Sequence, residues 1–261
     1  MANDNGASHT TAGMNKLIHE LLQGNRHAAS RLISMVENDR AFGRAVVDRL
    51  KPRLGTAQKV GITGPPGSGK STLINELTGL LRKKRKRVGV IAIDPTSPVA
   101  GGALLGDRIR MHGLFRDTGV FIRSMATRKG TGGLAPAAGY AAAILDALGM
   151  DVIFIETTGV GQSEIAVRDA VHTVVVVVTP DLGDDIQLMK AGIMEIGDIF
   201  VVNKGDLTNA GRTARDLKGM IRMRPGREKR PSVVVTAASE GKGVKRLLEE
   251  IEKMKGLHSR K

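Results

Sequence analysis

The sequence predicts an α/β fold in which a mostly parallel sheet of about seven strands is covered by helices on both faces. Seven short apolar runs alternate with stretches of helical character, such as residues 135–148. Most of these runs lack inside/outside alternation, which is typical of parallel strands that are buried on both faces. A length of 261 residues suits one large α/β domain with a small appendage. The expected strands comprise residues 60–62, 88–93, 120–122, 152–155, 174–178, 199–202 and 233–235.

The composition limits the function classes. The absence of cysteine excludes disulfides, Cys-ligated zinc and thiol catalysis, and it fits a cytoplasmic protein. Neither a signal-peptide pattern nor an apolar run of membrane-spanning length is found, so no membrane association is expected. A net charge of +14 suits polyanionic ligands. Because aromatic residues make up only 2% of the chain, stacking surfaces are scarce, and this disfavours nucleic acid as a partner.

Four segments are expected along the chain. Residues 1–13 are polar and predict a disordered tail, whereas residues 14–54 carry apolar side chains at helical spacing and predict two or three helices. The α/β domain is expected over 55–256, followed by a basic tail at 257–261. Six consecutive basic residues at 82–87 have two interpretations, a polyanion-binding patch or a solvated helix end whose cations suit the helix dipole. The second interpretation is favoured.

The stretch GPPGSGKS matches the phosphate-binding loop pattern G-x-x-x-x-G-K-[ST]. Its glycines let successive backbone N–H groups turn inward around phosphate oxygens, and Lys70 is placed to reach the β and γ phosphates. Residues 59–63 form a buried strand that enters the loop, and a helix is expected from Gly69 to about Arg82, with its positive end toward the phosphates. This combination predicts the P-loop NTPase fold. The expected phosphate-binding residues are Gly64, Pro65, Pro66, Gly67, Ser68, Gly69, Lys70, Ser71 and Thr72.

Polar loops follow four of the expected strands. In a parallel sheet these carboxyl ends meet at one edge, which is where ligands bind. A hard cation such as Mg²⁺ takes hydroxyl and carboxylate oxygens together with phosphates, and Ser71, Asp94, Asp107 and Glu156 are the candidate ligands. Glu156 occupies the position at which most GTPases have the Asp of the motif D-x-x-G. The other two loops carry Asn203, Lys204, Asp206, Thr236, Ala237 and Ala238.

NKGD, residues 203–206, matches N-K-x-D and indicates how the base is selected. The carboxylate of Asp206 can accept from both N1–H and the exocyclic amine of guanine, while the Lys204 stem packs on the ring. Adenine offers no such donor pair, and a bidentate contact discriminates by about 1–3 kcal/mol. With the phosphate loop, this motif predicts Mg-dependent hydrolysis of GTP to GDP and phosphate.

We expect Lys70 to face an open site without nucleotide, so that Lys70→Ala would leave melting unchanged. Gln162 does not directly follow Gly159, so it receives no role in positioning water.

These motifs, with GGALLGDRIRM (101–111), FIRSMATRKGTGGLA (121–135) and GDDIQLMKAGIMEIGD (183–198), resemble the G-protein chaperones of adenosylcobalamin-dependent acyl-CoA mutases, the methylmalonyl-CoA mutase-associated GTPases. Some members carry an older label as lysine/arginine/ornithine transport ATPases. The resemblance covers about residues 17–251. It implies slow GTP hydrolysis coupled to gated cobalamin delivery to a mutase and to protection of that mutase.

The resemblance also implies roles for individual residues. The family's phosphate and magnesium residues match, by position, Lys70, Ser71, Asp94, Asp107 and Glu156, of which Lys70 and Glu156 are expected to be catalytic, and its base reader matches Asp206. Gln187 and Lys190 match an additional switch of the catalytic site that signals to the mutase. Relatives continue into a dimerisation arm where this chain stops at Lys261, so a monomer or a weak nucleotide-dependent homodimer is expected.

Two other function classes stay open. A transport-linked ATPase or kinase is disfavoured by NKGD. A metal-insertion or ribonucleoprotein GTPase of related fold is disfavoured by the absence of cysteine, of a His-rich tract, and of a Met-rich or aromatic surface.

Overall fold

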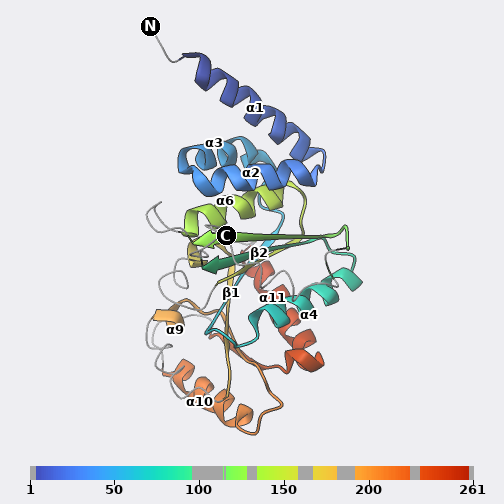
Figure 1. The fold of residues 1–261 in the computed structure, drawn as a ribbon. Coiled ribbons are helices and arrows are strands. Elements are labelled where there is room, and N and C mark those ends of the chain that lie inside the picture. The colour runs from blue at the N-terminus through green and yellow to red at the C-terminus, as the bar shows by residue number, and fades with distance from the viewer. Residues whose placement is uncertain are drawn as a thin grey trace.

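The computed structural model describes residues 4–95, 114, 116–127, 134–157, 167–180, 192–223 and 230–258 (Figure 1). Its centre is one seven-stranded sheet in the order β3-β2-β4-β1-β5-β6-β7. Every neighbouring pair is parallel, which confirms the predicted fold class. The strands are β1 (Gln58–Thr63), β2 (Val88–Pro95), β3 (Val120–Thr127), β4 (Val152–Glu156), β5 (Thr173–Val178), β6 (Ile199–Val202) and β7 (Ser232–Val235).

The central strand β1 marks the point where the strand order reverses. On one side it pairs with β4, with Ile62 opposite Glu156, and on the other with β5, with Thr63 opposite Val176. Ligands bind outside the carboxyl ends of parallel strands at such a switch point. The phosphate loop follows β1 directly, so the topology places it there.

Each face of the sheet has its own helical cover. On one face, helices α4 (Lys70–Lys83) and α11 (Val244–His258) pack against strand residues that include Phe154, Val175 and Val177. On the other, α6 (Leu134–Ala147) covers the half that includes Ile155, while α9 (Met194–Ile196) and α10 (Ala210–Arg222) cover the β5–β6 half. Successive residues of one strand therefore enter different cores, which explains the apolar runs without alternation.

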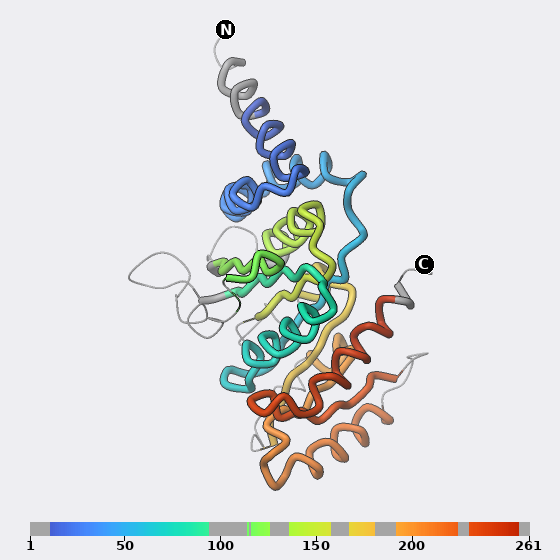
Figure 2. The backbone as a smooth tube through the Cα atoms, turned by 90° about the vertical axis from the view of Figure 1, so that its right-hand side faces the viewer, coloured from blue at the N-terminus to red at the C-terminus, as the bar shows by residue number. Residues whose placement is uncertain are grey.

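Three helices precede the sheet and form an outer layer on α6 (Figures 1 and 2). They are α1 (Asp4–Leu22), α2 (Arg26–Asn38) and α3 (Arg40–Leu50), followed by the 3₁₀ turn η1 (Lys51–Arg53). The side chain of Asn25 caps α2 and that of Asp39 caps α3. Buried residues of this layer share one core with α6 and the sheet.

Helix α1 differs from its prediction. It begins at Asp4, whereas the sequence predicted a disordered tail up to Gly13. Among the residues of α1 whose burial is described, Thr11, Ala12 and Gly13 are exposed and Met14 is buried. The physical reason is cooperativity, because a helix that is nucleated by packing extends through polar residues at little cost per residue.

The other short helical turns are η2 (Val167–Ala170) and η4 (Ala238–Glu240). Within the described ranges, no helix has the length and apolar character needed to cross a bilayer.

Candidate functional site

The phosphate loop joins β1 to α4 through three glycines with positive φ. The φ angles are 140° at Gly64, 75° at Gly67 and 89° at Gly69. A Cβ at Gly64 would lie 2.0 Å from the carbonyl oxygen of Val177, and one at Gly69 would lie 2.3 Å from Nδ2 of Asn203. Gly64 and Gly69 are therefore fixed both by backbone conformation and by close neighbours. The loop and α4 present backbone N–H groups and a helix N-terminus, which suits an anion.

Lys70, the first residue of α4, is folded back over this loop. Its Nζ donates to the carbonyl oxygens of Gly64 and Pro65, at 2.8 and 2.9 Å, and the residue is only 6% exposed. The expectation that Lys70 faces an open site is therefore wrong. Loop carbonyls hold the ammonium group close to the loop because a buried cation needs acceptors.

Ser71 and Glu156 meet at the junction of α4 and β4. The Ser71 hydroxyl donates to Oε1 of Glu156 at 2.6 Å, and both residues are buried. Glu156 is the last residue of β4, next to Ile62 of β1. A hydroxyl and a carboxylate are oxygen donors of the kind that Mg²⁺ takes alongside phosphates, so this pair fits the ion. The longer side chain of Glu reaches Ser71 from a strand end.

Thr157 fixes the backbone that leaves β4, a role that sequence reasoning missed. Its hydroxyl donates to Oγ1 of Thr63 at 3.0 Å, and its N–H donates to the carbonyl of Ile62 at 3.1 Å. Both threonines are fully buried. The sequence did contain a signal for this role, namely a threonine directly after a buried strand. A buried hydroxyl needs a hydrogen-bond partner, and here the neighbouring strand supplies it.

Asn203 links the phosphate loop to the loops that follow β6 and β7. Its Nδ2 donates to the carbonyl of Ser68 at 2.8 Å. Its Oδ1 accepts from the hydroxyl of Thr236 at 3.0 Å and from the N–H of Ala238 at 3.1 Å. Asn203 is 3% exposed, so these bonds are shielded from water. One side chain thus connects the loops that follow β6 and β7 to the phosphate loop.

Lys204 and Asp206 form the open end of the site. Both are exposed, and Lys204 has a φ of 55°, in the left-handed region. Between them, the N–H of Gly205 donates to the carbonyl of Thr236 at 2.8 Å. Thr236, Ala237 and Ala238 are buried beneath these loops.

Lys242 adds a positive charge at this open end of the site. A hydrogen bond to Glu240 and the charge of Glu240 raise the pKa of Lys242, and Asp206 adds to the effect. Lys242 is placed by backbone hydrogen bonds with Ala237.

The structure brings the two sequence motifs to one edge of the sheet. Asp94 lies at the carboxyl end of β2, at the same edge, and its side chain is outside the description. Asp107, Gln162, Gln187 and Lys190 lie outside the described residues.

Comparison with known proteins places this site in a family. The model of the family described as Methylmalonyl Co-A mutase-associated GTPase MeaB matches residues 29–260. The chain belongs to the MeaB family of GTPases. A putative GTPase of Pyrococcus abyssi is 51% identical over 243 residues, which cover 92% of this chain and 75% of the relative. The mouse protein named methylmalonic aciduria type A homolog, mitochondrial, is 34% identical over 250 residues, covering 88% of this chain and 60% of the relative.

Among solved structures, one described as a LAO/AO transport system kinase matches this MeaB-family chain with a TM-score of 0.74 and 27% identity. The match covers 98% of this chain and 77% of that one. As a member of the MeaB family, the chain is a GTPase that binds guanine nucleotides.

Proposed function

We propose that this MeaB-family GTPase binds Mg·GTP across the two ends of the site and uses hydrolysis to gate delivery of cobalamin to an acyl-CoA mutase and to protect that mutase. Phosphates lie in the loop Gly64–Ser71, and guanine lies against Lys204 and Asp206. The observation that carries the nucleotide part is the hydrogen-bond set of Asn203, which connects the two loops.

The residues of the phosphate end act on the charge of the transferred phosphoryl group. Lys70 exchanges its bonds to loop carbonyls for the β and γ oxygens, where its charge offsets negative charge in the transition state. Ser71 and Glu156 hold Mg²⁺, which neutralises phosphate charge when bound. The hydroxyl pair of Thr157 and Thr63 keeps Glu156 at the strand end.

The base end selects the nucleotide. Asp206 accepts two hydrogen bonds from the guanine edge, and the exposed stem of Lys204 packs on the ring. Because the carboxylate is already exposed, it binds the base without breaking a hydrogen bond to any of the described residues.

The partner is inferred from the family. Its description names methylmalonyl-CoA mutase, and the mouse relative is named for methylmalonic aciduria. In this proposal Gln187 and Lys190 respond to the mutase, and Lys190 then approaches the transition-state charge. A cation supplied on activation raises GTPase rates by about 10³–10⁵-fold, so the unstimulated rate is slow.

The test measures GTP hydrolysis with and without an adenosylcobalamin-dependent acyl-CoA mutase, in Mg²⁺ and after its removal with chelator. The mutase should raise the rate, and Lys190→Ala should bring the ratio of stimulated to basal rate close to one. Lys218→Ala, at an exposed position of α10, is the matched control and should keep that ratio.

Two results would contradict the proposal at different points. A rate that no acyl-CoA mutase changes would remove the partner, with the nucleotide chemistry unaffected. An equal loss of basal and stimulated rates in Lys190→Ala would place that residue in the intrinsic site.

A further inference from the structure

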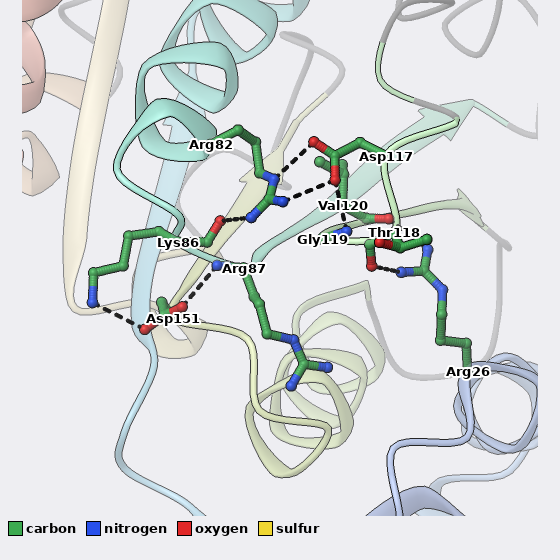
Figure 3. A network of polar contacts seen from close by, with 9 residues as sticks. All are labelled: Arg26, Arg82, Lys86, Arg87, Asp117, Thr118, Gly119, Val120 and Asp151. Carbon is green, nitrogen blue, oxygen red and sulfur yellow. Dashed lines mark hydrogen bonds and ion pairs between the residues drawn. The ribbon is translucent and has the colours of Figure 1, made fainter.

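The basic run at residues 82–87 is tied to other parts of the chain. Arg82 binds Asp117 through two bonds of 2.8 and 2.9 Å, and Lys86 binds Asp151 at 3.2 Å (Figure 3). These pairs fasten the end of α4 to the segments that lead into β3 and β4. Both cations therefore already have anionic partners within the fold.

Val235, the last residue of β7, is an exposed apolar side chain at the edge of the sheet that carries the nucleotide site. It is 40% exposed, whereas the preceding Val234 is buried in the core beneath α4 and α11. The contact that Val235 makes is with the base-reading loop. A Cβ built on Gly205 would lie 2.7 Å from Cγ1 of Val235. Val235 thus packs against the residue between Lys204 and Asp206.

Gly205 is required by this contact and not by its backbone conformation. Its φ is outside the left-handed region, in contrast to the φ of 55° at Lys204. A Cβ at position 205 would meet the Val235 methyl at 2.7 Å and the carbonyl oxygen of Thr236 at 3.0 Å. Carbon atoms in good contact are about 3.5–4.0 Å apart. The missing side chain therefore lets the loop lie directly on the end of β7.

The end of β7 is the fixed side of this contact. The N–H of Thr236 donates to the carbonyl of Val202 in β6 at 2.9 Å, and its own carbonyl accepts from the N–H of Gly205 at 2.8 Å. A Cβ at Gly243 would lie 2.2 Å from the carbonyl oxygen of Val235, so a second loop also touches this backbone. The valine side chain is stiff because it branches at Cβ. A side chain added at position 205 would therefore displace the exposed NKGD loop and not the strand.

We propose that the contact between Gly205 and Val235 holds Asp206 in position for the guanine edge, so that these two residues determine base selectivity without touching the base. This assignment rests on the proposed function, in which Asp206 accepts two hydrogen bonds from guanine. Asp206 follows Gly205 directly, and both of its bonds need good geometry at the same time. A displacement of about 0.5 Å is enough to lose such geometry. Gly205 and Val235 are thus positioning residues.

The test compares the affinities of GDP and inosine diphosphate by calorimetry in Mg²⁺. The base of inosine diphosphate keeps N1–H and lacks the exocyclic amine, while the ribose and phosphates are the same. The ratio of the two affinities therefore reports on the second bond of Asp206. The wild type should prefer GDP by about tenfold or more. Gly205→Ala should lower this ratio at least about fivefold, because the displaced carboxylate no longer makes both bonds.

The matched control for the added methyl group is Gly211→Ala. Gly211 is exposed on α10, and a Cβ there would meet nothing within 4 Å outside its own helix. The ratio of this variant should stay within about twofold of wild type. Urea denaturation checks that every variant folds.

Val235→Ala separates the contact from a general effect on folding. Alone, it removes the methyl group that supports Gly205 and should lower the ratio at least about twofold, but less than Gly205→Ala does, because the bond of Gly205 to Thr236 is kept. In the double variant Gly205→Ala/Val235→Ala, the new Cβ occupies the space of Cγ1. The ratio should then recover most of the loss, and this non-additivity is expected only for residues in contact.

A second background shows whether Gly205 acts through Asp206. In Asp206→Asn, which lacks the carboxylate, Gly205→Ala should not change the ratio further. A wild-type ratio near one would remove Asp206 as the reader of the amine, and this assignment with it. With a wild-type ratio of about ten, the reader stands and the positioning role alone is overturned if Gly205→Ala or Val235→Ala keeps the wild-type ratio. It is also overturned if the double variant recovers nothing, or if Gly205→Ala has the same effect in both backgrounds.

Discussion

The two ends of the nucleotide site differ in burial and in how far their polar side chains are hydrogen-bonded within the protein. At the phosphate end, Lys70 is 6% exposed, Ser71 9% and Glu156 4%, and each makes a hydrogen bond within the chain. At the base end, Lys204 and Asp206 are exposed. In the proposed function, nucleotide binding exchanges internal bonds for external ones at the first end, whereas it adds new bonds at the second.

This difference assigns stability and selectivity to separate residues. A buried group that loses its partner costs free energy of folding, whereas an exposed group can change without such a cost. Substitutions at the phosphate end should thus affect both folding and hydrolysis. Those at the base end should affect nucleotide choice alone, and Asn203 should show both effects because it bonds to both loops.

The largest expected effect is that of Lys70→Met, which keeps the length of the side chain and removes its charge. Hydrolysis should fall by at least about 10²-fold, because the offset of transition-state charge is lost. The nucleotide-free protein should also lose about 1–3 kcal/mol of stability, since two loop carbonyls lose their donor. Single-turnover hydrolysis and chemical denaturation measure the two effects. An unchanged denaturation midpoint would show that the internal bonds of Lys70 contribute nothing to folding.

Asp206→Asn should remove most of a preference for GDP over ADP that we expect to be at least about 10²-fold. Asparagine cannot accept twice from the guanine edge, so preference should move toward xanthosine nucleotides, which calorimetry can measure. Stability should stay within about 0.5 kcal/mol of wild type because the position is exposed. Asp216→Asn, at another exposed carboxylate on α10, is the control for the charge change. Equal affinity of the wild type for GDP and ADP would refute the assignment of Asp206.

Asn203→Ala should weaken GDP binding by about 10-fold or more and lower stability by about 2–4 kcal/mol, because three shielded hydrogen bonds are lost together. Asn209→Ala changes an exposed asparagine whose side chain makes no cap bond, and it should change neither quantity. Titration with GDP measures the affinity, and urea denaturation measures the stability. If affinity falls while stability does not, Asn203 acts on the nucleotide and does not join the loops.

The smallest of these effects is expected for Glu156→Asp, which withdraws the carboxylate by one methylene from Ser71. The Mg²⁺ concentration for half-maximal hydrolysis should rise by about three- to tenfold, since a displaced carboxylate holds the ion less well. Activity at saturating Mg²⁺ should recover most of the loss. An unaltered Mg²⁺ requirement would mean that the pair formed by Ser71 and Glu156 does not hold the ion.

The sequence alone determined the parallel sheet, and it predicted a site at the carboxyl ends of the strands. Apolar runs without alternation, such as residues 174–178, predicted buried parallel strands, because each such strand packs against an apolar core on both faces of the sheet. The phosphate loop and NKGD predicted two ends of one site, since polar residues after parallel strands converge. Those inferences needed only local patterns and the geometry of a parallel sheet.

Tertiary structure decided which partners the same residues take. The bonds of Asn203 to Ser68, Thr236 and Ala238, and the bond of Ser71 to Glu156, join residues that are far apart in the chain. The fold also folded Lys70 back onto the loop carbonyls, and it paired Arg82, Lys84 and Lys86 while leaving Arg87 without a partner in the described part of the chain. No local pattern encodes these choices, because each depends on which donors and acceptors the packed elements bring within about 3 Å of one another.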